Sequence, residues 1–109
     1  MTRLEIAVPN MNDSFSRVVL DNVQYLIRFS WNMEAGRWSF GLYTIHKEPI
    51  ATGIRIVPNF PLNLQIMDDA FPFGVFGAYT DLDCIGREDF VNGKAIFAYI
   101  PVKQEEMLG

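Results

Sequence analysis

The sequence has few of the side chains that enzymes and metal sites use. Its 109 residues include one cysteine, Cys84, and one histidine, His46. One cysteine excludes an internal disulfide. One cysteine and one histidine cannot supply the usual four ligands of zinc. No Gly-x-Ser-x-Gly motif is present, and His46 falls in a predicted turn as a solvated side chain. We therefore predict a protein without catalytic residues, metal ligands or cofactors, in which Cys84 is a small, buried or half-buried side chain.

Long apolar runs and an excess of positive charge are also missing. No run approaches the ~20 residues of a membrane span, and residues 1–8 lack the basic and apolar regions of a signal peptide. Residues 1–57 carry six Lys/Arg and five Asp/Glu, whereas residues 58–109 carry three and eight. Because nucleic-acid affinity depends on neutralising phosphates, we expect no nucleic-acid and no membrane partner, and favour a basic partner.

Apolar residues recur at every second position along most of the chain. Residues 23–31 and 37–44 both alternate in this way, and the loop between them contains Asn32 and Gly36. Two such runs joined by a short loop predict a β-hairpin. The pattern continues in residues 49–57, so we expect these strands to form a meander.

Further strands are predicted at residues 3–8, 15–20 and 94–102, whereas residues 62–66 fit either a strand or one or two helical turns. Gly53, inside a strand pattern, predicts a bulge or a close backbone approach. No segment has the sustained pattern of a long helix. We predict an all-β fold, a small single-domain sandwich or barrel of six to eight short, mostly antiparallel strands over residues 1–102, with a polar tail at residues 103–109.

The aromatic content is high, with nine Phe, four Tyr and two Trp. The apolar faces of the predicted strands supply a core: Tyr25, Ile27, Phe29, Trp31, Trp38, Phe40, Leu42, Ile54 and Ile56. Four phenylalanines lie instead in or beside turn-rich sequence: Phe60, Phe71, Phe73 and Phe76. They could plug the ends of a barrel, or form an apolar patch for a protein partner, which we take as the candidate interface.

Carboxylates are the remaining candidates for chemistry. Residues 81–92 approach the calcium-binding register of an EF-hand, but Ile85 and Asn92 occupy ligand positions and no helices flank the loop, so a solvated acidic loop is the alternative. The neighbouring acids Asp68 and Asp69 would point to opposite faces of a strand, which argues against a glycosidase pair.

The ordered strand motifs resemble a known family. The chain is similar to the baseplate plug proteins of contractile-tailed phages in three motifs that follow one another in order. These are a strand ending Phe29-Ser30-Trp31-Asn32, then Gly36-Arg37-Trp38, and then Gly53-Ile54-Arg55-Ile56-Val57. Gly74, Asp89-Phe90 and the closing strand from Ala95 to Tyr99 also follow the pattern, so the resemblance spans residues 4–102. The small closing residues Ala95 and Ala98 and the aromatic loop at residues 71–77 depart from it.

The resemblance implies a non-enzymatic virion protein of the tail baseplate, made in the host cytoplasm. It would plug or join the distal end of the tail tube, beside the hub, central spike and tail tube proteins, as a homo-oligomeric ring of three- or six-fold symmetry. The alternative is a free-standing small-ligand or carbohydrate-binding β module, with Trp31 and Trp38 as stacking platforms. A carboxylate enzyme that depends on Asp89 is a third class.

Overall fold

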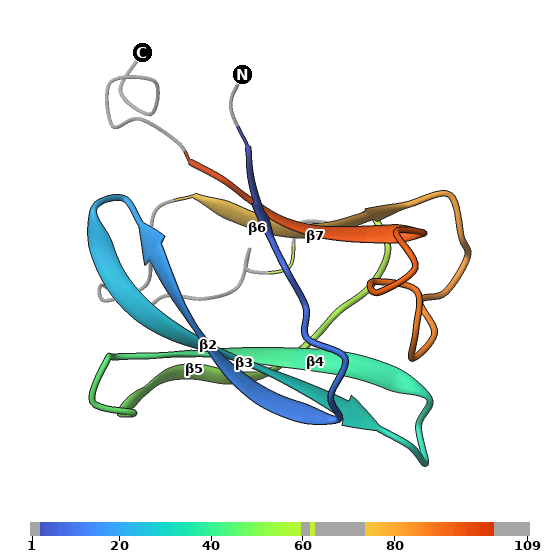
Figure 1. Cartoon of the computed structure of the whole chain (residues 1–109), viewed down its shortest axis with the longest axis horizontal. Helices are drawn as coiled ribbons and strands as arrows, with labels where there is room; N and C mark the ends of the chain where they lie inside the picture. Colours follow the sequence, from blue (N-terminus) through green and yellow to red (C-terminus); the bar gives the residue numbers. More distant parts are fainter. Residues whose placement is uncertain (1–2, 60–61, 63–73, 102–109) are drawn as a thin grey trace.

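The computed structural model describes residues 3–59, 62 and 74–101. Every regular element within these residues is a strand, and Figure 1 shows the strands in two layers. No helix in this part of the chain could span a membrane. The seven strands are β1 Leu4–Ile6, β2 Asp13–Leu20, β3 Val23–Asn32, β4 Arg37–Tyr43, β5 Pro49–Arg55, β6 Val75–Thr80 and β7 Ala95–Ile100.

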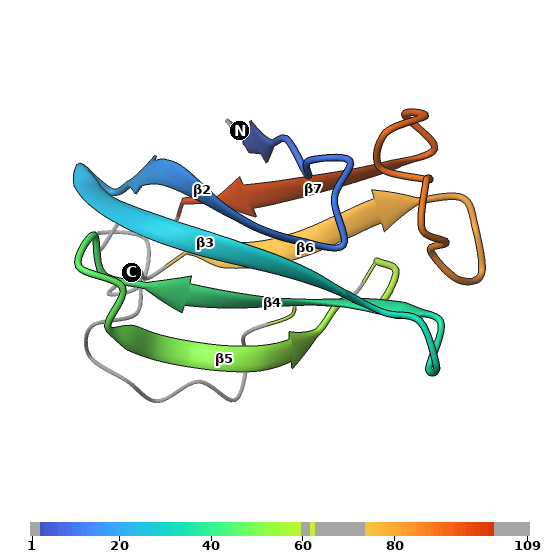
Figure 2. The same cartoon turned by 60° about the horizontal axis from the view of Figure 1, so that its bottom comes forward.

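Strands β2 to β5 form an antiparallel four-stranded sheet in chain order, in which β3 to β5 are the predicted meander and β2 pairs with β3 (Figure 2). The β2–β3 turn consists of Asp21 and Asn22, with φ of 54° and 68°. Asp and Asn tolerate this left-handed conformation better than most residues, which suits a two-residue hairpin turn. In the β3–β4 turn, Gly36 N donates to the Asn32 carbonyl oxygen at 2.8 Å. The predicted hairpin at residues 23–44 is therefore confirmed.

The remaining strands form a three-stranded antiparallel sheet with the order β1-β7-β6. Strand β6 is absent from the sequence prediction, which leaves Gly74 to Gly77 in a loop. The strand is not recognisable in the sequence, because Gly77 and Ala78 are both buried and interrupt the alternation of apolar and polar side chains. The predicted all-β, mostly antiparallel fold is confirmed, and of the two predicted forms the structure has the sandwich and not the barrel.

The core lies between the two sheets and is built largely from aromatic rings. Phe97 on β7 lies with its ring centroid 5.0 Å from Phe29, 5.1 Å from Phe40 and 5.9 Å from Phe76. These rings come from both sheets, and each is at most 1% exposed. Edge-to-face and tilted pairs at these distances add to the free energy gained by burial. Phe97 therefore joins the two layers at the centre of the molecule.

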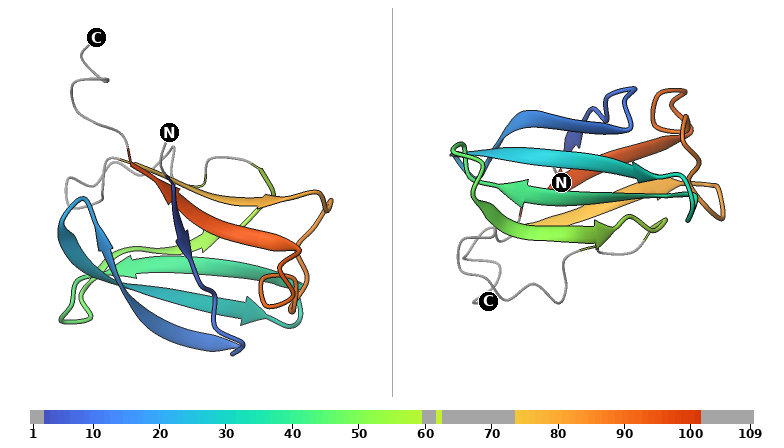
Figure 3. Two further views of the ribbon diagram at one scale, coloured as in Figure 1. Left: turned by 45° about the horizontal axis from the view of Figure 1, so that its top comes forward. Right: turned by 90° about the horizontal axis from the view of Figure 1, so that it is seen from below.

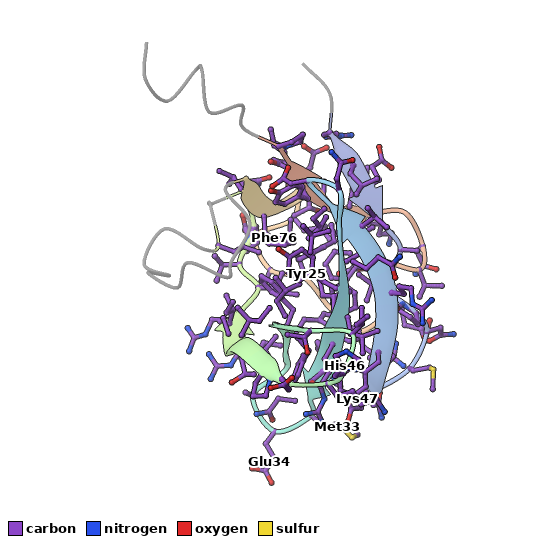
Figure 4. All side chains as sticks on the ribbon, turned by 90° about the vertical axis from the view of Figure 1, so that its left-hand side faces the viewer. Tyr25, Met33, Glu34, His46, Lys47 and Phe76 are labelled. Atoms are coloured by element: carbon purple, nitrogen blue, oxygen red, sulfur yellow. The ribbon has the colours of Figure 1, made fainter. Side chains whose placement is uncertain are left out.

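The predicted core residues lie at this interface or beside it. Trp31 and Ile54 are only partly buried but pack against the core. In Figure 4, Tyr25 lies inside the molecule, toward the layer that contains Phe76. The other seven predicted residues are at most 7% exposed: Tyr25, Ile27, Phe29, Trp38, Phe40, Leu42 and Ile56.

A bulge interrupts the pairing of β4 with β5 at Gly53, whose φ is 68°. The register shifts opposite Gly41, where a Cβ atom would lie 3.2 Å from the Ala51 carbonyl oxygen and from Thr52 Cα. Glycine accepts both the positive φ and the close backbone approach without steric cost. The bulge predicted from Gly53 is confirmed.

The two sheets are connected on one side of the sandwich and separate on the other. After β5, Pro58 forms a parallel bridge with Ala78 on β6. The Asn59 side chain donates to the Thr80 carbonyl oxygen at 2.7 Å and accepts from Thr80 N at 3.1 Å. On the other side, the edge strands β1 and β2 leave a groove of about 450 Å³, lined by residues that include Leu4, Ile6, Ala7, Pro9, Val18 and Val19.

The Tyr99 hydroxyl fastens the β2–β3 turn to the three-stranded sheet. It donates to Asp21 Oδ2 at 2.6 Å and accepts from Gly74 N at 2.7 Å. Burial, together with the hydrogen bond to Asp21, raises the pKa of Tyr99 above its ordinary value of 10.0. The hydroxyl therefore stays protonated and connects two segments far apart in sequence.

The Tyr99→Phe variant is expected to lose about 1–3 kcal/mol of its free energy of unfolding, because Gly74 N–H loses a buried acceptor. Urea denaturation of both proteins measures the difference. Tyr79→Phe is the matched control, since the Tyr79 ring lies under the Arg3 guanidinium at 5.5 Å and keeps that contact as Phe. An equal loss in the two variants would contradict the role of the Tyr99 hydroxyl.

Candidate interaction surfaces

The structure corrects one of the four predicted interface residues. Phe76 lies on β6, not in a loop, and is completely buried against Phe40 and Tyr99. Its assignment to a protein interface is wrong, because pairing of β6 with β7 directs its ring into the core. Phe60, Phe71 and Phe73 lie outside the described residues, so their place at an interface stays a prediction.

Trp38 does not form a stacking platform, and Trp31 is only partly exposed. Trp38 is 1% exposed, and Trp31 packs edge-to-face on it with the ring centroids 5.5 Å apart. Trp38 Nε1 donates to the Gly86 carbonyl oxygen at 3.3 Å, and the Arg87 guanidinium lies 5.3 Å from the Trp38 ring centroid. A sugar ring could not reach the face of Trp38, so one of the two tryptophans behind the carbohydrate-binding alternative is unavailable to a ligand.

The other candidates for chemistry are solvent-exposed or structural. His46 lies exposed in the β4–β5 turn, as predicted. Cys84 is also exposed, which contradicts the predicted buried or half-buried position. Asp89 Oδ2 accepts from Gly86 N, and its main-chain oxygen accepts from Lys94 N at 2.9 Å, so Asp89 organises its own loop. The described residues contain no group of three potential metal ligands.

This β6–β7 loop is held by several hydrogen bonds and carries exposed acids. Beyond the Asp89 bonds, the Arg87 guanidinium donates to Asn12 Oδ1 at 2.7 Å and to Asn10 Oδ1 at 3.1 Å. Arg87 is thus directed toward the β1–β2 connection, while three carboxylates face solvent. We call residues 81–89 the acidic loop, with its exposed side chains Asp81, Asp83 and Glu88.

The outer face of the four-stranded sheet carries most of the positive charge. Strand alternation sends the even residues of β2 and the odd residues of β3 inward, and their register places the remaining side chains together on the solvent side. The right-hand view of Figure 3 shows β2 to β5 side by side across this layer. We call its cations, including one from the β4–β5 loop, the basic face: Arg17, Arg28, Arg37, Lys47 and Arg55.

An aromatic ring lies among these cations. Phe15 is 42% exposed, with the Arg28 guanidinium 5.7 Å and Lys47 Nζ 5.2 Å from its ring centroid. Tyr43 packs edge-to-face on the same ring with the centroids 5.2 Å apart. Cations over an aromatic face are attracted to its quadrupole. Two cations of the basic face are therefore held beside an accessible apolar ring.

Asp13 is the one carboxylate among the strand positions of this face. Arg28 Nε and Nη2 donate to its two oxygens at 2.7 and 2.6 Å. These bonds hold the pKa of Asp13 below its ordinary value of 3.8. Glu34 and Glu48 lie in the turns at the ends of the sheet, and in Figure 4 Glu34 points away from the layers.

A titration by carbon NMR is expected to show a lower Asp13 pKa in the native chain than in Arg28→Gln, because Arg28 is the main cause of the lowered pKa. Because the folded pKa is lowered, the ion pair stabilises the protein above the unfolded pKa, and this stabilisation disappears as the pH falls through the folded value. The side chains of Arg28 and Asp13 are 40% and 54% exposed, so the contribution stays below ~1 kcal/mol. The same Asp13 pKa in both proteins would contradict the pairing.

The basic face is not predicted from the sequence, although the arginines that form it occupy recognisable positions in the strands. Arg28 lies on the polar side of an alternating strand, and Arg17, Arg37 and Arg55 occupy equivalent positions. Their convergence depends on the register of four strands, which periodicity alone does not fix. The first half of the chain is therefore almost neutral in sequence, although one face of the folded sheet is basic.

Comparison with known proteins identifies the family. No significant match was found among curated proteins. The sequence profile of the family described as cyanophage baseplate Pam3 plug gp18 matches residues 1–102 of the 109-residue chain. This range includes all seven strands and agrees with the resemblance that the strand motifs carry. The chain belongs to the cyanophage baseplate Pam3 plug gp18 family and is a structural protein of the phage tail baseplate.

Proposed function

We propose that this chain plugs or joins the distal end of the tail tube, where it contacts the hub, the central spike and the tube proteins without catalysing a reaction. Several copies form a ring of three- or six-fold symmetry around the tail axis. The observation that carries the proposal is the family match over residues 1–102, because it places the chain in a baseplate plug family.

Two surfaces support a role in assembly. On the basic face, Arg28 and Lys47 lie over the exposed ring of Phe15, and arginine with aromatic residues is enriched in protein interfaces. The edge strands β1 and β2 border a groove that apolar residues line together with Glu5, Ser16 and Arg17, and a bare edge can pair with an extended segment of a neighbour. Phe60, Phe71 and Phe73 are proposed as additional contacts.

Co-sedimentation with purified hub and spike proteins tests this function. We expect the chain to sediment with them, and we expect the tail tube protein to strengthen the complex. A control with added oligosaccharide should leave tryptophan fluorescence unchanged, because Trp38 is buried. Absence of binding to hub, spike and tube alike would contradict the proposed position in the baseplate.

A further inference from the structure

We propose that the basic face of one copy docks against the acidic loop of a second copy, and that this contact builds the ring. The inference rests on the proposed function, since ring assembly is part of it. Beyond the ring itself, the inference names the two surfaces that meet and the opposite charges that bring them together.

The cations of the basic face are available to a partner. Arg17 and Arg55 are exposed, and Arg37 is partly exposed. Among the described residues, the ion pairs are Arg3–Glu5 and Arg28–Asp13, so these three arginines have no carboxylate partner there. Their guanidinium groups keep five N–H donors each, suited to bidentate bonds with carboxylates.

The same face offers apolar area between the charges. Phe15 and Val19 on β2 are 42% and 54% exposed and lie on the side that carries Arg17. A partner that covers them would remove apolar surface from water while its carboxylates meet the guanidinium groups. Exposed apolar side chains beside arginines are more typical of a protein interface than a surface that carries charge alone.

Charge complementarity indicates a second copy as the occupant. The five cations and Asp13 give the basic face +4, whereas the whole chain carries −4, so the rest of each copy carries −8. Counting Glu34 and Glu48 with the face leaves it at +2. In the acidic loop, Arg87 is engaged by Asn10 and Asn12, so Asp81, Asp83 and Glu88 dominate its exposed charge. A loop already fixed by hydrogen bonds loses little entropy on binding.

The positions of the two surfaces suit a ring. The acidic loop connects β6 to β7 at one end of the three-stranded sheet, whereas the basic face covers the outer side of the other sheet (Figure 1). Contact between different surfaces of identical chains is head-to-tail, and such contacts generate closed rings when the rotation allows closure. Duplex DNA is the less favoured occupant, because −8 on the remainder of the chain repels phosphates.

Sedimentation velocity of the full chain at low and high salt tests this contact. We expect self-association that weakens with salt and falls about tenfold or more in Arg17→Glu/Arg55→Glu and in Asp83→Lys/Glu88→Lys. An equimolar mixture of the two double variants should associate again, because each reversed surface then meets its opposite. Arg3→Glu, a charge reversal outside the basic face, is the control and should associate like the unaltered chain.

Circular dichroism tests whether each variant is folded. If Arg17→Glu/Arg55→Glu is unfolded, Arg17→Gln/Arg55→Gln takes its place. A chain that stays monomeric, or association that survives both reversals, would overturn the inference. Retention of duplex DNA by the unaltered chain, abolished in Arg17→Glu/Arg55→Glu, would also overturn it, in favour of nucleic acid. Co-sedimentation with hub and spike is independent of these results, so failure of the ring contact can be distinguished from failure of the proposed function.

Discussion

The Phe97→Ala variant is expected to lose about 3–5 kcal/mol of its free energy of unfolding. Phe97 contacts aromatic rings from both sheets and is 1% exposed, so truncation leaves a cavity at the centre of the core. The total free energy of unfolding of a natural protein is about 5–15 kcal/mol, so this loss is a large fraction of the stability of the variant. Urea denaturation, followed by tryptophan fluorescence, measures the change.

Phe15→Ala is the matched control for this prediction. It removes the same atoms from a ring that is 42% exposed on the outer face, where no cavity can form. We expect a loss below ~1 kcal/mol. Similar losses in the two variants would mean that Phe97 does not connect the layers.

The Gly74→Ala variant is expected to lose about 3–5 kcal/mol of its free energy of unfolding. A Cβ atom at position 74 would overlap the Tyr99 ring and the Ile100 carbonyl oxygen, and neither can move without disturbing β7. The shift would also break the bond from Gly74 N to the Tyr99 hydroxyl. The midpoint of urea denaturation should therefore fall further than in Tyr99→Phe, which leaves the backbone in place.

Gly93→Ala provides the comparison for Gly74→Ala. A Cβ atom at Gly93 would meet no atom within 4 Å, but φ is 77°, so the cost is backbone strain alone. We expect a loss of about 1 kcal/mol. If Gly74→Ala is no more damaging than Gly93→Ala, the close packing of β6 against Tyr99 is incorrect.

Local periodicity was sufficient for most of the fold. The two-residue period predicts the hairpin of β3 and β4, and Trp38, Phe40 and Leu42 are buried as their alternation requires. It fails at β6, where Gly77 and Ala78 are buried without large side chains to mark the strand. The burial of Phe76 follows from pairing with β7, a contact between segments distant in sequence.

The candidate surface was less predictable than the fold. Arg17, Arg28 and Arg55 come from three strands, and they share one face only because of the strand register. Charge counted along the sequence suggests a basic partner for an acidic second half, but not that this chain itself carries a basic surface. The family likewise follows from ordered motifs, whereas the interface residues needed the structure.

Cryo-electron microscopy of tails from the phage that encodes this chain tests its role as a baseplate plug most directly. We expect density for the two-sheet sandwich, repeated around the tail axis at the distal end of the tube, in contact with the hub and spike. Purified tails that lack this chain, or that hold it away from the tube end, would contradict the account.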